Sequence, residues 1–286
     1  DALAPAINYA KNGYPVSPTV AYSWATAFDI YKEALKGREF EFWFDTFAPG
    51  GICPGVGDNV KLKDHGKTLR RIAKTLGEDF YRGELAQRID DFSKEYGGFI
   101  SKDDLADYYP EWVEPISADY KGYEVYEIPQ NGHGITALMA LNILKGMDLG
   151  PKDSFNSTHF QIEALKLAFT DVQKYVADPR IMKIKTDELL SEGYARGRRS
   201  LITDKAIMPK AGNPSKGGTV YLCTADGDGN MVSYIQSNYM GFGSGLVVPG
   251  TGIALHNRGA NFNMDEESDN CVGSCKRPYH TIIPCN

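Results

Sequence analysis

Residues 217–236, GGTVYLCTADGDGNMVSYIQ, are the stretch that decides the fold. Thr219–Ala225 is rich in β-forming residues, Asp226–Asn230 has the composition of a tight turn, and Met231–Gln236 is a second run of β-formers. The pattern predicts a β-hairpin. The preceding residues 208–218, MPKAGNPSKGG, are polar and rich in glycine and proline, which is typical of an exposed, mobile loop. A strand that opens with threonine directly after such a loop is a setting suited to cleavage of the chain.

Two short patterns resemble ligand sites but fit turns better. Asp226-x-Asp228-x-Asn230 has the spacing that starts a calcium-binding EF-hand loop, but Met231 stands where that loop requires glycine, and the bidentate glutamate is missing. Residues 129–134, PQNGHG, lack the lysine and hydroxyl residue of a P-loop and the glycine spacing of a dinucleotide site. We therefore interpret them as a hairpin turn and a strand-to-helix turn.

The residues upstream of the hairpin read mainly as helices. Ser17-Pro18 is a helix cap followed by proline, and apolar residues then recur at helical spacing. A long helix is predicted over residues 158–176, because Asp178-Pro179 ends its apolar stripe. Residues 120–128 alternate like a strand and lead through residues 129–134 into a helix near residues 136–145.

Composition narrows the classes of function. The chain has 286 residues and a net charge of -6, which argues against nucleic acid as a main partner. No apolar segment is long enough to span a bilayer. The five cysteines are an odd, sparse set that slightly favours a cytoplasmic location, while export stays open because Asp1 need not be the natural start. The short basic run Arg196, Arg198 and Arg199 is interpreted as a solvated helix face.

The sequence contains no familiar catalytic triad. None of the five histidines lies in a Ser-His-Asp or metal-binding pattern. His133 and His280 lie in turns rich in glycine or proline and are candidates for a role in a site, although a lone histidine is more often a surface or packed residue. Cys271, Cys275, His280 and Cys285 cluster, but their irregular spacing favours ordinary thiols over a structural zinc ion.

An ordered series of motifs carries a resemblance to a known family. The series consists of Thr219-Val220-Tyr221, Asp228-Gly229-Asn230-Met231-Val232-Ser233, Gly241-Phe242-Gly243-Ser244-Gly245, Gly252-Ile253-Ala254-Leu255-His256-Asn257-Arg258-Gly259 and Phe262. It closely resembles the opening of the small subunit in the γ-glutamyltransferase family of N-terminal-nucleophile (Ntn) hydrolases. Upstream, residues 3–7, residues 13–17 and Ala177-Asp178-Pro179 are similar to the large subunit of that family, so the similarity covers essentially the whole chain.

The resemblance implies an α+β fold, a four-layer αββα sandwich. Residues 1–218 would form the large-subunit portion and residues 219–286 the start of the small subunit, together in one domain. It also implies a precursor that cleaves itself between Gly218 and Thr219. The freed Thr219 would carry both the attacking hydroxyl and an α-amine, with an ordinary pKa of about 8, that accepts the hydroxyl proton. No metal or organic cofactor is then required.

Further site residues are implied by the same resemblance. Ser237 matches a hydroxyl residue near the nucleophile, and Tyr239 stands where transpeptidases usually have asparagine. Asn261 replaces the aspartate that holds the α-amine of the glutamyl group, and Arg258 replaces a neighbouring acidic or amide residue. Losing that carboxylate removes a charge-assisted hydrogen bond worth about 1.5–3 kcal/mol to an ammonium group.

Two more cationic residues depart from the family pattern. Lys276 and Arg277 match paired serines that help hold the α-carboxylate of the substrate. Together with Arg258 they favour a more anionic substrate without an amine, and surface ion pairs are the alternative explanation for each. The family's substrate arginine and oxyanion-hole glycines match positions outside residues 1–286.

The sequence therefore predicts an autoprocessing enzyme that transfers or hydrolyses γ-glutamyl, glutathione-type or related N-acyl amides. Its partners would be a small amide or peptide substrate, water or an amino-acid or peptide acceptor, and the large and small fragments of one precursor. A cephalosporin- or glutaryl-type acylase with the same nucleophile is one alternative. A non-catalytic relative that keeps the fold as a binding or structural module is the other.

Overall fold

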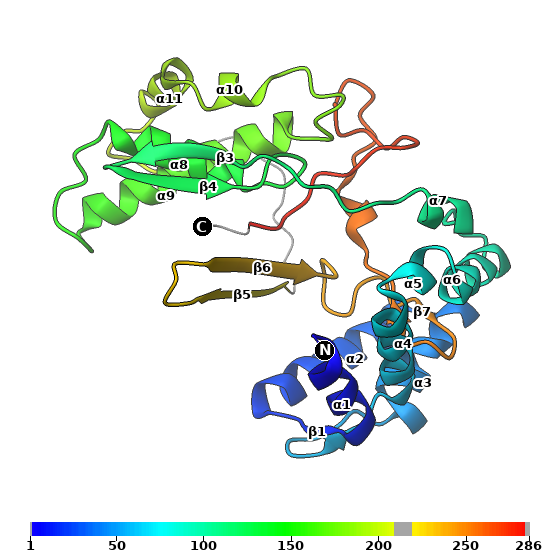
Figure 1. Ribbon diagram of the computed structural model, residues 1–286. Coiled ribbons are helices and arrows are strands. Elements are labelled where there is room, and N and C mark those ends of the chain that lie inside the picture. Colours follow the sequence, from blue (N-terminus) through cyan, green and yellow to red (C-terminus); the bar gives the residue numbers. More distant parts are fainter. Residues whose placement is uncertain (1, 209–218, 284–286) are drawn as a thin grey trace. The chain divides into compact units, whose positions relative to one another are not determined.

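The computed structural model describes residues 2–208 and 219–283, with Thr219 described through its backbone (Figure 1). Gly218, on the other side of the predicted cut, lies outside the described residues. The chain divides into two compact units: Asp1–Glu111 with Met240–Asn257, and Trp112–Tyr239 with Arg258–Asn286. These boundaries differ from the predicted division between residues 218 and 219. The predicted division between residues 218 and 219 concerns cleavage of the chain and stays a prediction. That the two portions together form one domain also stays a prediction.

The first unit, which we call unit 1, is mainly helical. The cap predicted at Ser17 is present, because Ser17 Oγ accepts a hydrogen bond from the backbone N–H of Val20 at 3.3 Å. Two short antiparallel strand pairs, β1–β2 and β7–β8, complete the unit. The elements are α1 (Ala4–Asn12), β1 (Tyr14–Pro15), α2 (Pro18–Ala34), α3 (Glu41–Phe47), β2 (Asn59–Val60), α4 (Lys63–Thr75), α5 (Glu78–Tyr81), α6 (Glu84–Glu95), α7 (Lys102–Ala106), β7 (Val247–Val248) and β8 (Ile253–Ala254).

Aromatic side chains form the core of unit 1. Trp43 is fully buried. The centroid of its ring lies 5.3 Å from the centroid of the Phe242 ring, and the two rings meet edge to face. Trp24 donates from Nε1 to the carbonyl of Phe47 at 2.9 Å, so its one polar atom is satisfied inside the core. The apolar residues predicted to recur at helical spacing after Ser17-Pro18 include Trp24, which faces this core, and Val20, which is exposed.

The second unit, unit 2, contains the hairpin that the sequence predicts. Helices α8 and α9 pack together through buried residues such as Ile143 and Leu167, and α8 also packs on the β3–β4 hairpin. The predicted long helix begins at Phe155, because Ser154 caps it, and ends at Tyr175. The elements are β3 (Ile116–Tyr120), β4 (Tyr123–Glu127), α8 (Ile135–Lys145), α9 (Phe155–Tyr175), α10 (Thr186–Leu189), α11 (Glu192–Arg199), β5 (Thr219–Ala225), β6 (Met231–Ser237) and the 3-10 helix η3 (Arg258–Asn261).

The β5–β6 hairpin has the predicted strands and turn. The strands are antiparallel, with Thr219 opposite Ser237 at the open end and Ala225 opposite Met231 beside the turn. In the turn, Asp226 Oδ1 accepts hydrogen bonds from the backbone N–H groups of Asp228 and Asn230, each at 3.0 Å. The Asp226 carboxylate therefore stabilises the turn, which explains the Asp226-x-Asp228-x-Asn230 pattern. None of the helices within the described ranges has the length and apolar character needed to cross a membrane.

Candidate active site

The proposed nucleophile lies at the open end of the β5–β6 hairpin. Thr219 is the first residue of β5, and its antiparallel register places it directly opposite Ser237, the last residue of β6. Directly opposed residues are nearest neighbours across an antiparallel pair. The structure therefore brings together the nucleophile and the hydroxyl residue that the sequence assigns to its vicinity. The catalytic role of each stays a prediction.

Ser237 also shapes the chain that follows the hairpin. Its Oγ accepts a hydrogen bond from the backbone N–H of Tyr239 at 2.9 Å. Tyr239 has a φ of 77°, in the left-handed region that costs a non-glycine residue about 1 kcal/mol or more. The Tyr239 side chain is nevertheless buried, with 7% of the residue exposed. Such a conformation persists where the surroundings fix it, and it concentrates at functional sites.

A buried arginine lies against this tyrosine. Arg258 begins η3 and is 2% exposed, and its guanidinium carbon lies 4.9 Å from the centroid of the Tyr239 ring. Its Nη1 donates to Thr281 Oγ1 at 2.7 Å. Burial lowers the pKa of Arg258, but an arginine in a protein stays protonated. A fixed positive charge therefore lies beside the end of the hairpin.

Two turns that contain candidate histidines also meet in unit 2. The backbone N–H of His133 donates to the carbonyl of His280 at 2.9 Å, and that of His280 donates to the carbonyl of Asn131 at 2.9 Å. The hydroxyl of Tyr279 lies 2.8 Å from His133 Nδ1. Burial and the positive charge of Arg258 lower the pKa of His133 to about 4, so its imidazole is neutral at pH 7. Burial raises the pKa of Tyr279, so its hydroxyl stays protonated and can donate a hydrogen bond to that imidazole nitrogen.

The other predicted substrate residues occupy the segment from η3 to residue 277. Asn261 lies in η3 with Arg258; its carbonyl accepts from Asn270 Nδ2 at 2.6 Å, and its own Nδ2 is buried with no hydrogen-bond partner among the described residues. Lys276 Nζ donates to the carbonyl of Cys271 at 2.6 Å. The backbone N–H of Arg277 donates to Asp178 Oδ2 at 2.9 Å. Substrate binding by these residues stays a prediction.

Asp178 is a residue whose role the sequence does not reveal. Its side chain is 1% exposed and accepts from Arg180 Nε and from the backbone N–H of Arg277, each at 2.9 Å. The hydrogen bonds from Arg180 hold the pKa of the Asp178 carboxyl well below its usual range. Arg180 also donates from Nη2 to the carbonyl of Cys275 at 2.7 Å. Asp178 and Arg180 thus fasten residues 275–277 to the segment that follows α9, a contact that the sequence does not predict.

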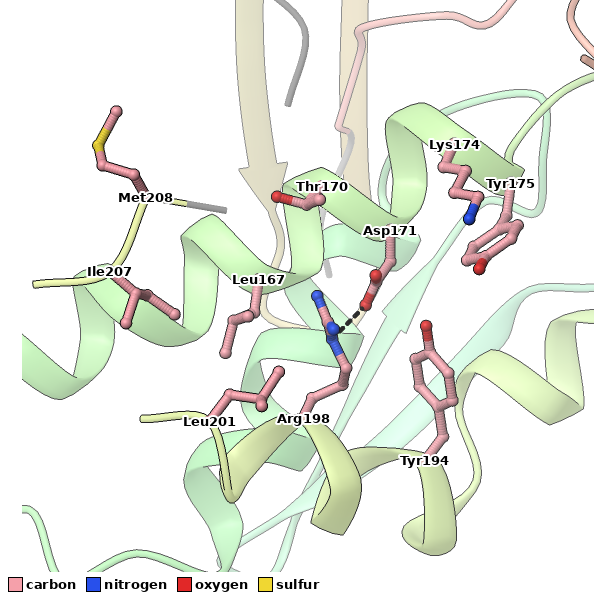
Figure 2. Close-up of a pocket in the computed structure, with 10 residues that line it drawn as sticks. All are labelled: Leu167, Thr170, Asp171, Lys174, Tyr175, Tyr194, Arg198, Leu201, Ile207 and Met208. Atoms are coloured by element: carbon pink, nitrogen blue, oxygen red, sulfur yellow. Dashed lines mark ion pairs between the residues drawn. The ribbon is translucent and has the colours of Figure 1, made fainter. Parts of the chain in front are cut away.

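A cavity of unit 2 lies elsewhere, between α9 and α11 (Figure 2). It has a volume of about 520 Å³, and among the described residues that line it none is a predicted site residue. Arg198 of α11 reaches Asp171 of α9 there, with 2.8 Å between Nε and Oδ2, and Asp171 is buried. Arg199 donates to the carbonyl of Ile143 at 2.6 Å. The prediction that the basic run is a solvated helix face is therefore wrong for Arg198 and Arg199, because both side chains make tertiary contacts.

Comparison with known proteins supports the same family. The gamma-glutamyltranspeptidase family matches residues 1–286. The glutathione hydrolase-like YwrD proenzyme of Bacillus subtilis is 37% identical over 290 residues, covering 99% of this chain and 53% of that protein. The crystal structure of cephalosporin acylase from Bacillus halodurans superposes with a TM-score of 0.94 at 55% identity, covering 99% of this chain and 52% of that one. The Helicobacter pylori gamma-glutamyltranspeptidase gives a TM-score of 0.63 at 29% identity, covering 72% of this chain and 58% of that one.

These likenesses settle the fold and the family. The chain spans about half the length of the curated relatives it matches. The structural neighbours have the Ntn-hydrolase fold, and the mixture of helices and strands described above is consistent with it, so the predicted α+β class is confirmed. Because the family match extends over every residue, this chain belongs to the gamma-glutamyltranspeptidase family.

Proposed function

We propose that the protein containing this chain is an autoprocessing γ-glutamyltransferase-like enzyme with Thr219 as its nucleophile. The observation that carries the proposal is the position of Thr219. It opens β5 directly opposite Ser237, in a chain that belongs to the family along its whole length. Relatives are named as glutathione hydrolase and acylase proenzymes, which supports a precursor that yields a large and a small fragment.

The chemistry needs only groups of the chain itself and water. In the precursor, the Thr219 hydroxyl attacks the carbonyl carbon of Gly218, the peptide C–N bond breaks, and an ester to the threonine oxygen remains. Water hydrolyses that ester and leaves Thr219 with a free α-amine. In catalysis this amine accepts the hydroxyl proton while the oxygen attacks a substrate amide. The leaving amine takes that proton, and water or an amine acceptor then receives the acyl group.

A glutaryl-type acylase is the second candidate, and the charges around η3 favour it. The buried Nδ2 of Asn261 is a hydrogen-bond donor, and Arg258 adds a positive charge beside the hairpin end. A donor and a cation attract a carboxylate or carbonyl group and oppose the ammonium group of a γ-glutamyl substrate. The 55% identity with the cephalosporin acylase supports this candidate as well.

N-terminal sequencing of the purified full-length protein tests the proposed nucleophile. The wild-type protein should give two fragments, the smaller of which begins at Thr219. Thr219→Ala should stay intact because it lacks the hydroxyl, and Thr219→Ser should still be cut because it retains both hydroxyl and amine. An intact wild-type protein, or a cut that persists in Thr219→Ala, would refute the mechanism and favour a non-catalytic relative.

A pair of matched substrates separates the two acyl specificities. We expect the mature enzyme to hydrolyse glutaryl-p-nitroanilide and γ-glutamyl-p-nitroanilide at different rates, because the two differ only in the α-amine, which the glutaryl compound lacks. Activity on the glutaryl compound alone would reject the transferase assignment. Arg258→Gln should then raise the KM for the glutaryl substrate, whereas a KM that does not change would remove Arg258 from the acyl pocket.

A further inference from the structure

The cavity between α9 and α11 has a polar side and an apolar side (Figure 2). Its volume of about 520 Å³ lies in the range of pockets that bind small molecules. The guanidinium of Arg198 lies between the two sides, with Asp171 on the polar one. The apolar side is formed by Leu167, Leu201 and Ile207. The cavity therefore presents a cation next to an apolar wall.

Asp171 holds the guanidinium of Arg198 in place. Asp171 is 5% exposed, and its Oδ2 lies 2.8 Å from Arg198 Nε. Burial raises the pKa of the Asp171 carboxyl, and the charge of Arg198 opposes that rise. No other group of residues 2–208 and 219–283 forms an ion pair or hydrogen bond with the Nη1 or Nη2 atom of Arg198. The end of the guanidinium is therefore open to a ligand, which can bind two of its N–H donors at once.

The charges that line the cavity do not cancel. Lys174, one turn beyond Asp171 on α9, is exposed and has no ion pair with any carboxylate of the described residues. Its Nζ lies 5.0 Å from the centroid of the Tyr175 ring. Burial and the neighbouring Asp171 carboxylate raise the pKa of the Tyr194 hydroxyl, so this group stays neutral. Two cations, Arg198 and Lys174, thus face one carboxylate, and this balance favours a ligand with a single negative charge.

We propose that this cavity binds a small carboxylate that carries an apolar tail. The carboxylate accepts parallel hydrogen bonds from Nη1 and Nη2 of Arg198, an arrangement that the planar guanidinium favours. The tail packs against Leu167, Leu201 and Ile207. Inorganic phosphate fits less well, because it carries more charge and has no apolar part. Among the described residues that line the cavity there is neither Thr219 nor a predicted substrate residue, so the proposal does not depend on the proposed function.

Methionine NMR can locate a ligand in this cavity, because Met208 lines it. The sample is the full-length Thr219→Ala protein with ¹³C-labelled methionine methyl groups, so that chain cleavage plays no part. Met208→Leu identifies the signal of that residue. We expect hexanoate to shift the Met208 signal until it saturates, and to leave the signal of exposed Met264 unchanged. Hexanamide, which has no charge, and acetate, which has no tail, should each bind at least tenfold more weakly.

Variants of the Thr219→Ala protein test the role of the guanidinium. Arg198→Lys keeps a positive charge beside Asp171 but has no planar fork, so hexanoate should bind at least tenfold more weakly. Asp171→Asn combined with Arg198→Gln should lose as much, and it leaves no buried charge unpaired. Arg196→Gln, at an exposed position of the same helix, is the matched control and should not change the affinity. Arg258→Gln should not change it either, because Arg258 does not line this cavity.

Four results would overturn the proposal. Equal binding of hexanamide and hexanoate would mean that the cavity recognises only the apolar tail, and displacement of hexanoate by an equal concentration of inorganic phosphate would mean a general anion site. Loss of binding in Arg258→Gln would place hexanoate beside the β5–β6 hairpin instead. The fourth result is unchanged affinity in an Arg198 variant that still melts cooperatively by circular dichroism. If both Arg198 variants unfold, Leu201→Asp puts a carboxylate in the apolar wall at a 47% exposed position, and unchanged affinity there has the same meaning.

Discussion

The guanidinium carbon of Arg258 lies 4.9 Å from the centroid of the Tyr239 ring, and both residues are buried. Tyr239 follows the hairpin strand that pairs with Thr219, and Arg258 begins η3, which also contains Asn261. This contact therefore joins the end of the nucleophile hairpin to the turn that carries two of the predicted substrate residues. The unusual backbone of Tyr239 presents its ring to Arg258, and the hydrogen bond to Ser237 holds that backbone.

Removing the Tyr239 ring should destabilise unit 2. A desolvated cation–π contact contributes about 2 kcal/mol, and the loss of aromatic packing adds to it, so Tyr239→Leu should lower the free energy of unfolding by about 2–3 kcal/mol. Tyr239→Phe keeps the ring and should lose less than half as much. Urea denaturation followed by circular dichroism measures both, and equal losses in the two variants would show that the ring face contributes nothing.

Replacing Ser237 should slow cleavage of the precursor. Ser237→Ala removes the acceptor of the Tyr239 N–H and the hydroxyl opposite Thr219. The loss of one neutral hydrogen bond corresponds to about a 2- to 10-fold slower step, which time-resolved gel analysis of the precursor can measure. Ser237→Thr retains a hydroxyl and should be cut at close to the wild-type rate. Unchanged cleavage in Ser237→Ala would place the serine outside the reaction.

His133 should make the fold sensitive to acid. Its pKa is about 4 in the folded protein and about 6.5 in the unfolded chain, so protonation favours unfolding. The contribution to stability is complete above pH 6.5 and is lost as the pH falls toward 4. At pH 5 the free energy of unfolding should be about 2 kcal/mol lower than at pH 7.5 from this residue alone.

Histidine variants isolate that contribution. His133→Gln should flatten the dependence of unfolding free energy on pH between 7.5 and 5, because glutamine does not titrate. His256→Gln, at an exposed position, is the matched control and should keep the wild-type slope. An unaltered slope in His133→Gln would mean that the imidazole is charged or accessible in the folded protein.

Asp178 should matter far more than an exposed acidic residue of the same unit. Asp178→Asn removes the charge that holds Arg180 and the backbone of Arg277, and charged hydrogen bonds of this kind contribute about 1.5–3 kcal/mol. Asp119, which pairs with Lys145 at the surface, is the control, and Asp119→Asn should cost about 0.5 kcal/mol or less. Thermal melts compare the two, and similar shifts would contradict an anchoring role for Asp178.

The sequence by itself determined the local elements and the family. The β5–β6 hairpin follows from β-forming residues on either side of Asp226, whose side chain accepts hydrogen bonds within its own turn, and most of α9 follows from an apolar stripe and a stop. The ordered motifs that follow Thr219 indicate the family from the sequence alone, without any tertiary contact. All of these signals connect residues within a few positions of one another, so a linear pattern is enough to find them.

Only the tertiary structure decided which buried polar groups meet. His133 and Tyr279 are 146 positions apart, and Arg258 reaches Thr281 from another turn. The sequence placed Arg198 on a solvated face, yet it pairs with buried Asp171. A buried charge or imidazole must find its partner wherever packing brings one, since leaving it unpaired is costly. That partner is set by how α9, η3 and the turns fold together, and no local spacing records it.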